Sequence, residues 1–454
     1  MHVPTQQQWK HPSVRRFAGD GDPVELMLET AADAALNAMQ EGWSGPPFDP
    51  FRLAEISHID VVPNGDVLDA RTVPISQGRV QIEYNPSRPR ARIRYSVAHE
   101  VAHTFFPDCA TEIRNRAARS EYQPHDWELE MLCNLGAAEL LMPTGSLAEY
   151  ADKTLSIRDV LDLRKQFEVS TESVLLRLIR VTHQPYTMFV ASRAPSSQAR
   201  YKIDYSISSR AGSGCPPRHT FLPRHTILST CTAMGYIATS DEDWPGVGRV
   251  HIDCVGVSPY PGHMYPRVVG LLRPTQVSNA DVASVRFVTG DATNPQGAEQ
   301  QILAHVVNDA TPNWGAGFGR AVQKKWPEAQ QAFKEWWFKS QGRSLGQVFC
   351  SKINNRLSVC QMICQHGYGP SDRPRLRYAA LRDCLIGLRN QALADKGSVH
   401  MPRIGTGQAG GSWTLVSALI DEVLCAAGVP VTIYDLPSAR NAPAVARSLF
   451  DRSE

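Results

Sequence analysis

The last third of the chain alternates short apolar segments with longer amphipathic ones, and this alternation restricts the possible folds more than any other feature. Apolar and β-branched runs predict strands at 285–291, 302–308, 358–364, 398–405 and 431–436, and helical periodicity predicts helices at 318–337, 377–394 and 414–428. Strands that alternate with helices form a mixed sheet flanked by helices. Ligands of such sheets bind at the loops beyond the carboxyl ends of the strands.

Two glycine-rich loops follow strands of this predicted sheet, at residues 314–319 and 405–411. Such loops let backbone N–H groups approach phosphate oxygens closely, and the first leads into a predicted helix N-terminus, which favours anions. Glycine loops also occur as simple tight turns. The loops therefore indicate a phosphate-bearing ligand only together with the other residues of this edge.

Residues 94–109, RYSVAHEVAHTFFPDC, contain the pattern H-E-x-x-H. On a helix, His99 and His103 share one face and would converge on one metal ion, and the Glu100 carboxylate would reach a water molecule at that ion. The pattern indicates a metal site. An ordinary helix with two structural histidines is the alternative.

A third ligand is needed, since catalytic zinc usually takes three protein ligands and a water. The helix predicted at 127–141 offers Glu130, and Asn134 one turn later is placed to orient a ligating histidine. Glu128 is a rival third ligand. Two residues are candidate donors to the oxyanion that develops during hydrolysis, Tyr122 and His125.

The rest of the first 183 residues reads as mostly helical. The pattern predicts a helix over 24–40, a strand ending near Asn85, an arginine-rich linker, a helix entered at Tyr95, and two short helices over 156–181, the second capped by Ser170 or Thr171. The last two have the outline of a helix-turn-helix without a basic face. We therefore expect no binding to nucleic acid.

Residues 184–275 contain short β-branched and aromatic runs bounded by Pro, Gly and Ser, which predict a small β-rich module. Six potential zinc ligands fall in it: Cys215, His219, His225, Cys231, His251 and Cys254. Their spacings match no common zinc finger or ribbon, so we expect no second zinc site.

The composition is that of a globular protein, with 42% hydrophobic and 20% charged residues and a net charge of +2. No apolar run has the roughly 20 residues that span a bilayer, and the N-terminus lacks the apolar core of a signal peptide. The ten cysteines lack C-x-x-C pairs, and several lie in apolar runs. They predict buried free thiols in a reducing cytoplasm.

The two helices that carry the metal pattern resemble the ImmA/IrrE family of bacterial metallopeptidases. That family pairs R-x-x-x-A-H-E-x-x-H with E-x-x-x-N/D-x-F-A-A-x-L-L-M-P, and the matching positions are Arg94, Ala98 to His103, Glu130, Asn134, Ala137, Ala138 and Leu140 to Pro143. The resemblance covers about residues 24–182. It implies Zn²⁺ held by His99, His103 and Glu130, with Glu100 as the general base that cleaves peptide bonds. Gly136 stands where the family commonly has Phe, which we expect to thin the local packing.

The C-terminal pattern resembles a macro domain, the module that binds ADP-ribose, and it is most similar to the terminal ADP-ribose glycohydrolase type and to macro modules of chromatin remodellers. The resemblance covers about residues 284–437. It implies that Asp291 accepts a hydrogen bond from adenine, that Asn308 lies near the distal ribose and that Tyr434 stacks near the adenine. The other contacts it implies are Ala292, Gly315, Gly317, Phe318, Gly319, Arg403, Gly405, Thr406, Gly407, Gln408, Ala409 and Gly410.

The sequence departs from the glycohydrolase type at two positions. That type has a Lys after the central strand and an Asp in the second glycine loop, whereas here Gln365 or His366 and Ala409 stand at about those positions. The resemblance therefore implies a sensor or anchor for ADP-ribose. His366 and Asp309 leave removal of ADP-ribose as an alternative.

Together these features predict a multidomain α+β and α/β chain. Its predicted parts are an N-terminal extension (1–23), a mostly helical zincin-like metallopeptidase domain (24–183), a β-rich middle module (184–275), an α/β/α macro domain with a mixed sheet (284–437) and a tail (438–454). We expect a cytoplasmic zinc endopeptidase that cleaves a specific protein, such as a transcriptional regulator or an ADP-ribosylated protein, under the direction of ADP-ribose. An ADP-ribose-binding scaffold with structural zinc and an ADP-ribosyl glycohydrolase are the alternatives.

Overall fold

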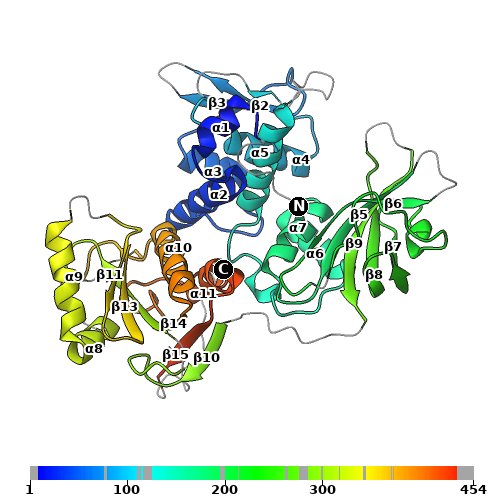
Figure 1. The fold of residues 1–454 in the computed structure, drawn as a ribbon. Coiled ribbons are helices and arrows are strands. Elements are labelled where there is room, and N and C mark those ends of the chain that lie inside the picture. The colour runs from blue at the N-terminus through cyan, green and yellow to red at the C-terminus, as the bar shows by residue number, and fades with distance from the viewer. Residues whose placement is uncertain are drawn as a thin grey trace, which may run out of the picture. The chain divides into compact units, whose positions relative to one another are not determined.

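The computed structural model describes residues 9–75, 79–109, 114–115, 125–194, 200–212, 214–260, 264–275, 285–297, 300–315, 317–340, 344–369, 371 and 373–436. The chain divides into two compact units, one with residues 1–35 and 43–281 and the other with residues 36–42 and 282–454. Figure 1 shows the helices and strands of both units. None of the helices in the described part of the chain is both long enough and apolar enough to cross a membrane.

The first unit starts with a helical part that packs on a small sheet. The helices are α1 (Pro12–Ala18), α2 (Pro23–Gln40), α3 (Pro50–Ile56), α4 (Arg90–His103), α5 (Asp126–Leu141), α6 (Ile157–Phe167) and α7 (Thr171–Val181). The sheet has the order β1-β3-β2-β4, from β1 (Asp60–Pro63), β2 (Ala70–Pro74), β3 (Val80–Tyr84) and β4 (Arg114–Asn115). Helix α4, which carries the metal pattern, contacts β2, β3 and α5.

Helix α4 begins at Arg90, five residues before the start that the sequence predicted at Tyr95. The arginines of the expected linker make ion pairs that hold this first part of the helix. Arg92 Nε lies 2.5 Å from Asp69 Oδ1, and Arg94 Nε lies 3.1 Å from Glu168 Oε2. Arg94 is buried, whereas the side chains of Arg90 and Arg92 stay exposed.

Gly136 lies where α5 approaches α4 most closely. A Cβ atom at this position would lie 2.9 Å from Ala102 Cβ and 2.9 Å from Met27 Sδ. The absence of a side chain therefore allows tight packing of the two helices. The expected thinning of the core at this position was wrong.

Helices α6 and α7 each begin with a serine cap, and Ser170 is the one of the two predicted candidates that caps α7. Ser156 and Asp159 form a reciprocal capping box at α6, and the Ser170 hydroxyl accepts a hydrogen bond from Ser173 N at α7. The Ile157 amide at the start of α6 donates to Asp253 Oδ2 over 2.7 Å. This contact ties α6 to the sheet that follows.

The segment expected to be β-rich forms a five-stranded antiparallel sheet of order β6-β5-β9-β8-β7. Its strands are β5 (Thr187–Arg193), β6 (Tyr201–Ser208), β7 (Ile237–Trp244), β8 (Gly248–Val257) and β9 (Arg267–Pro274). One face buries Phe189, Trp244 and Ile252 in a common core. Within the described residues, its cysteines and histidines form no group of three that could hold a metal ion.

The second unit is built on a six-stranded sheet of order β10-β15-β14-β11-β13-β12. Its strands are β10 (Val285–Thr289), β11 (Gln301–Asn308), β12 (Val348–Lys352), β13 (Leu357–Gln365), β14 (Ser398–Pro402) and β15 (Val431–Asp435). All neighbouring pairs are parallel except β12 and β13. The mixed sheet confirms the fold class predicted from the alternating pattern.

Helices cover both faces of this sheet. They are α8 (Gly317–Lys325), α9 (Pro327–Lys339), α10 (Tyr378–Asp395) and α11 (Trp413–Val423). Figure 1 shows α8 and α9 on one face and α10 and α11 on the other. The single helix predicted at 318–337 is two helices, because Pro327 cannot continue the backbone hydrogen bonding of α8 and instead begins α9.

Cys350 and Cys360 form a disulfide between facing positions of β12 and β13. This corrects the expectation that every cysteine is a free thiol. The two residues lie directly opposite one another in an antiparallel pair, a relation that cannot be read from the sequence because β12 was not predicted. The eight other cysteines are free, and all but Cys215 are buried.

Candidate functional site

The metal pattern lies on the buried part of α4. His99, Glu100 and His103 are each 1% exposed or less. The one-turn spacing brings the Nε2 atoms of His99 and His103 to 3.2 Å from one another. Two buried imidazoles thus direct ring nitrogens to one point, which is the arrangement of metal ligands.

Glu130 reaches the same point from α5. Its Oε2 atom lies 3.0 Å from His99 Nε2, and its Oε1 atom lies 3.5 Å from His103 Nε2. Ligands about 2.0–2.1 Å from zinc at tetrahedral angles lie about 3.3 Å from one another. The three side chains therefore fit a single divalent ion, with histidine and carboxylate donors that suit zinc.

The three groups also perturb one another electrostatically. Burial favours the neutral acid at Glu130, but hydrogen bonds from His103 and His99 outweigh it and hold the Glu130 pKa well below its ordinary value. Burial disfavours the charged form of His103, yet the adjacent Cys133, Glu130 and Glu100 raise the His103 pKa. Mutual perturbation of this kind is typical of functional sites.

Glu100 is held by a residue that the sequence did not single out. Thr72 Oγ1 on β2 donates to Glu100 Oε2 over 2.9 Å and also lies 3.3 Å from the Glu100 backbone oxygen. Within the described structure, Glu100 Oε1 has no hydrogen-bond partner. One carboxylate oxygen is thus fixed and the other is available to a proton.

The remaining predicted residues of this site lie elsewhere. Glu128 accepts hydrogen bonds from the Lys10 and His11 amides over 2.9 and 2.8 Å, which places it against the N-terminal segment. Asn134 Oδ1 accepts from Tyr95 OH over 2.6 Å, while the Nδ1 atoms of His99 and His103 have no partner among the described residues. Asn134 thus links α5 to α4. His125 lies at the start of α5, and Tyr122 lies outside the described residues.

In the second unit, the carboxyl ends of the parallel strands bring the other predicted residues to one edge of the sheet. Asp291 is exposed just after β10, and its Oδ1 accepts from Thr293 N. Asn308 ends β11, and its Oδ1 accepts from the amides of Ala310 and Thr311. Ala292 is buried beneath this edge.

The first glycine loop leads directly into α8. Gly317 has φ +58°, a backbone conformation that favours glycine, and it is the first residue of the helix. Gly315 is exposed, and Phe318 packs on the core beneath the loop. A Cβ at Gly319 would lie 3.2 Å from Trp314 Cβ. The loop therefore presents backbone rather than side chains to the edge.

The second glycine loop follows β14. Gly405 has φ +71°, and its backbone oxygen accepts from Gly411 N, which closes the loop. Gly407, Gln408 and Gly410 are exposed on it. Ala409 is buried, and Thr406 Oγ1 donates to the Arg403 backbone oxygen. The two loops thus follow different parallel strands and lie beyond the same edge of the sheet.

Residues 63–179 match the family model described as the IrrE N-terminal-like domain, Peptidase_M78. The match contains α4, α5 and the candidate metal ligands. The radiation response metalloprotease IrrE of Deinococcus radiodurans is 26% identical over 200 residues, which are 39% of this chain and 57% of that protein.

The solved structure of a macrodomain protein from Streptomyces coelicolor is 36% identical and has a TM-score of 0.30. The match covers 34% of this chain and 99% of that one. Over this part the chain is similar in sequence to a macrodomain protein. It carries an IrrE-like domain as well, and both resemblances drawn from the sequence are confirmed.

A curated relative shares only part of its length with this chain. The chromodomain-helicase-DNA-binding protein 1-like of Mus musculus is 30% identical over 169 residues, which are 35% of this chain and 19% of that protein. The chain thus spans about a fifth of the length of that relative and 57% of IrrE.

Tyr434 and Arg403 of the macrodomain have partners within the protein. Tyr434 is buried, and its hydroxyl lies 3.0 Å from Gln296 N and 2.9 Å from His400 Nδ1. Arg403 pairs with both carboxylate oxygens of Asp435 at 2.7 and 2.8 Å. These contacts make both side chains supports of the edge. The stacking role of Tyr434 stays a prediction.

A histidine–aspartate pair lies at the same edge of the macrodomain. Asp309 Oδ2 lies 2.8 Å from Nδ1 of the exposed His366, and Asp309 Oδ1 accepts from Gly367 N over 2.8 Å. Burial favours the neutral acid at Asp309, but the bonds from Gly367 and His366 lower its pKa. A carboxylate that holds an exposed imidazole is a possible base for proton transfer.

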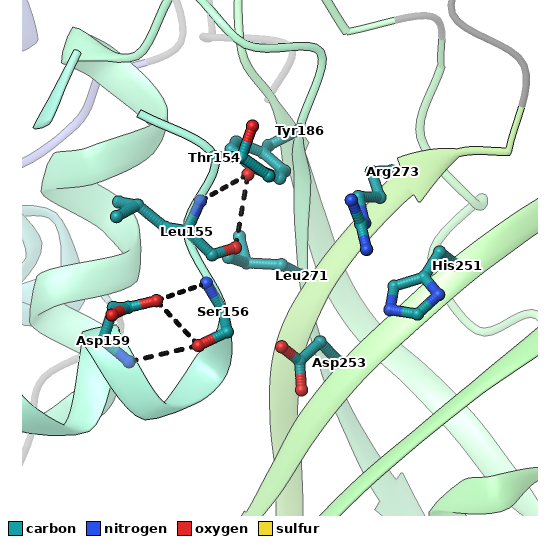
Figure 2. Close-up of a pocket in the computed structure, with 9 residues that line it drawn as sticks. All are labelled: Thr154, Leu155, Ser156, Asp159, Tyr186, His251, Asp253, Leu271 and Arg273. Carbon is teal, nitrogen blue, oxygen red and sulfur yellow. Dashed lines mark hydrogen bonds between the residues drawn. The ribbon is translucent and has the colours of Figure 1, made fainter. Parts of the chain in front are cut away.

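A pocket of about 130 Å³ lies apart from the predicted residues, where α6 begins against β8 and β9 (Figure 2). His251, Asp253 and Arg273 project toward it from the strands, opposite Ser156 and Asp159. None of the predicted site residues lines it. The pocket belongs to the junction between the helical pair and the five-stranded sheet.

Proposed function

We propose that this chain is a zinc-dependent endopeptidase that cleaves a specific protein, such as a regulator or repressor. Its macrodomain binds ADP-ribose or ADP-ribosylated protein and thereby directs or switches the cleavage. One observation supports the peptidase part of the proposal most strongly. The Glu130 carboxylate lies 3.0 Å from His99 and 3.5 Å from His103.

The side chains of the candidate metal centre supply the groups that peptide hydrolysis needs. His99, His103 and Glu130 would hold Zn²⁺, which supplies a Lewis acid and makes water acidic enough to react near neutral pH. Glu100 takes the proton of the attacking water on its free oxygen and delivers it to the leaving amine. Thr72 keeps the carboxylate in place during both transfers.

The macrodomain edge supports the ADP-ribose part of the proposal. Two loops with exposed backbone and an exposed carboxylate at Asp291 lie beyond the ends of parallel strands, where open α/β sheets bind ligands. If the target carries ADP-ribose, binding at this edge raises its local concentration at the peptidase by tethering alone. No conformational change between the units is required for that effect.

Replacing Glu100 with Gln tests the peptidase. We expect the E100Q variant to keep about one zinc per chain by metal analysis, and the cleavage rate to fall by about 10²–10⁴-fold, because only the proton transfer is lost. New protein N-termini in a bacterial lysate treated with the wild type, and not with the variant, would report cleavage. A wild-type protein without metal, or equal cleavage by both proteins, would contradict the proposal. A scaffold with structural zinc would show metal in both and cleavage in neither.

Calorimetry with ADP-ribose tests the second half of the proposal. We expect heat of binding with the full chain, and loss of that heat when Asp291 is replaced by Ala. AMP and ribose 5-phosphate serve as controls for the two ends of the ligand. No heat at high micromolar ADP-ribose would remove the macrodomain from the proposed mechanism.

The hydrogen-bonded pair of His366 and Asp309 favours a second candidate function, hydrolysis of ADP-ribose from modified protein. Asp309 would orient the imidazole, and His366 would activate water. Release of ADP-ribose from a mono-ADP-ribosylated protein should then persist in E100Q and disappear in H366A. No release by the wild type would leave the macrodomain as a binding module.

A further inference from the structure

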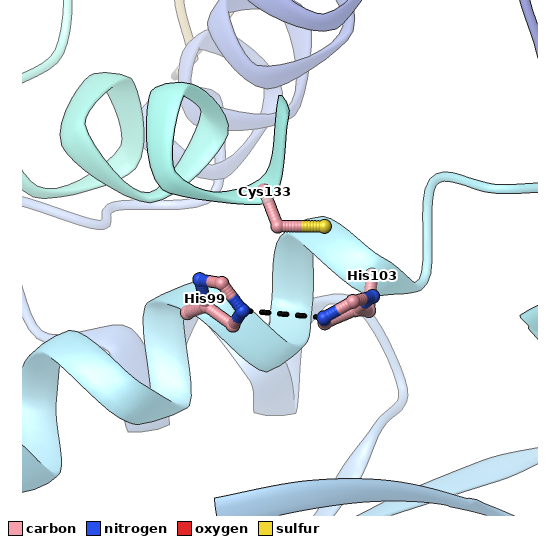
Figure 3. Close-up of side chains that lie close together, drawn as sticks. All are labelled: His99, His103 and Cys133. Atoms are coloured by element: carbon pink, nitrogen blue, oxygen red, sulfur yellow. Dashed lines mark hydrogen bonds between the residues drawn. The ribbon is translucent and has the colours of Figure 1, made fainter. Parts of the chain in front are cut away.

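A fourth potential ligand lies beside the three residues of the candidate metal centre. Cys133 on α5 is fully buried, and its Sγ atom belongs with ring nitrogens of His99 and His103 to a group whose members all lie within 4.8 Å of one another. Figure 3 shows Cys133 entering from the neighbouring helix beside the two imidazole rings of α4. The thiol therefore faces the point at which the histidines converge.

The helical spacing explains why a thiol and a carboxylate share this place. Glu130 and Cys133 are three residues apart on α5, so their side chains lie on the same face of that helix. Gly136 continues that face one turn later and lets α5 approach α4 closely. Both side chains are thereby presented to His99 and His103.

The distances require only a small movement. A sulfur about 2.3 Å from zinc and a nitrogen about 2.05 Å from it lie about 3.6 Å apart at tetrahedral geometry. The Sγ atom lies within 4.8 Å of the ring nitrogens, which is at most about 1.2 Å more than this separation. Thiolate is also a preferred zinc ligand.

We propose that Cys133 is a fourth ligand of the metal ion in the resting protein. Two histidines, a carboxylate and a thiolate complete a tetrahedral set, and structural zinc sites are closed in this way whereas catalytic sites keep a position open. The resting centre is therefore closed, and the thiolate must leave before water reaches the ion. This inference rests on the metal centre of the proposed function, and it adds a means of holding the peptidase inactive.

X-ray absorption at the zinc edge of the full-length protein tests the ligand set directly. We expect one sulfur at about 2.3 Å together with nitrogen and oxygen ligands at about 2.0–2.2 Å. A spectrum with nitrogen and oxygen ligands alone would overturn the inference while the zinc centre stands. A protein that binds no zinc would overturn both the inference and the peptidase.

Cobalt substitution with cysteine variants provides the second measurement. We expect the Co²⁺ form of the wild type to show a near-ultraviolet sulfur-to-cobalt charge-transfer band, and the C133A variant to lack it while it keeps about one metal per chain. Metal affinity should fall at least about tenfold in C133A. The matched control is C109A, which removes another buried cysteine of the same unit and should keep the band. A band that persists in C133A would overturn the assignment.

A change in peptidase activity separates the inference from the function it rests on. If Cys133 closes the centre, C133A should cleave faster than the wild type by about tenfold or more under reducing conditions. Sulfur ligation without cleavage by either protein would support the ligand and contradict the peptidase. Equal cleavage by C133A and the wild type would show that the thiolate does not restrain the site.

Discussion

Thr72 holds the buried Glu100 carboxylate in one orientation. The hydroxyl fixes one oxygen over 2.9 Å, and the backbone of β2 holds the hydroxyl in place. A carboxylate free to rotate in a buried site would spend part of its time turned away from the water. In the proposed mechanism, the hydrogen bond therefore acts on catalysis through the orientation of the Glu100 carboxylate.

Replacing Thr72 with Val, which has nearly the same shape, should lower kcat by about 10- to 100-fold, because a hydrogen bond to a charged group contributes about 1.5–3 kcal/mol. Steady-state kinetics on a cleaved substrate would measure kcat and KM, and we expect KM and zinc content to stay close to the wild type. Thr72→Ser restores the hydroxyl and is the matched control. Equal rates for the Val and Ser variants would exclude this role.

His305 on β11 is a buried residue of the macrodomain whose titration affects stability. Both ring nitrogens lack a hydrogen-bond partner among the described residues, Trp314 packs edge-on against the ring, and burial lowers the His305 pKa to about 4. The unfolded chain takes up a proton near pH 6.5, whereas the folded protein resists protonation down to about pH 4. The contribution of His305 to the free energy of unfolding is therefore fully present above about pH 6.5 and is lost as the pH falls toward 4.

The loss should reach roughly 3 kcal/mol by pH 4, since each pH unit in this window contributes about 1.4 kcal/mol. Urea unfolding of the full chain at a series of pH values would measure it. A His305→Phe variant has no imidazole to titrate, so its unfolding should lose this part of the pH dependence. The same slope in both proteins would assign the pH dependence to other groups.

At the scale of elements, the packing of α5 on α4 positions Glu130 at the candidate metal centre. Gly136 leaves no space for a side chain, since an added Cβ would approach Ala102 and Met27 within 2.9 Å. The same close approach brings Glu130 to the histidines of the neighbouring helix. The position that departs from the family pattern thus contributes to the site through the backbone.

Gly136→Ala should destabilise the first unit by about 1–3 kcal/mol through overpacking, despite the better helix propensity of Ala. It should also weaken zinc binding, because α5 moves away from α4. Thermal unfolding and zinc titration of the full chain measure the two effects. The matched control is Ala137→Gly, which removes a buried methyl on the same helix and lowers stability without pushing the helices apart. Unchanged zinc affinity in G136A would contradict this account.

The elements with strong periodicity could be predicted from the sequence, and the short ones could not. Helix α5, the helical pair α6 and α7 and the strands β11 and β13 lie close to their predicted positions, because each buries a regular apolar pattern. Strand β2 has only five residues, and β12 is a half-buried edge strand with Ser351 and Lys352. Neither carries a pattern that distinguishes it from a loop.

The same limit decided which site residues were found. His99, His103 and Glu130 follow helical spacings that indicate their chemistry, and the structure brings them together. Thr72 lies on an unpredicted strand and contacts Glu100 across the fold, so no local signal marks it. Cys133 could have been noticed, because it is one turn after Glu130, but its apolar neighbours suggested a core thiol.

At the scale of the whole molecule, the chain consists of compact units with separate cores. Phe333 and Trp337 belong to the core of the macrodomain, whereas Phe106 and Leu132 belong to that of the peptidase part. A ligand that binds one folded unit stabilises that unit. In the proposed function, the macrodomain recruits a target by tethering, which needs no energetic coupling between the two units.

We therefore expect ADP-ribose to raise one unfolding transition of the full chain and metal chelation to lower another. At 100 times its Kd, ADP-ribose should add about 2.7 kcal/mol to the stability of the macrodomain. Differential scanning calorimetry with each treatment alone and with both would resolve the transitions, with Asp291→Ala as the control for the ligand. A shift of both transitions by ADP-ribose would instead demonstrate energetic coupling between the units.

Helix α6 is held at both ends by contacts with other elements. Its first amide donates a hydrogen bond to Asp253 of β8. Glu168, which directly follows its last turn, forms an ion pair with Arg94 of α4, five residues before His99. Helix α6 therefore connects the five-stranded sheet to α4, the helix that carries His99 and His103. A displacement of β8 would move α6 and tilt α4. Such a tilt would change the distances from His99 and His103 to Glu130.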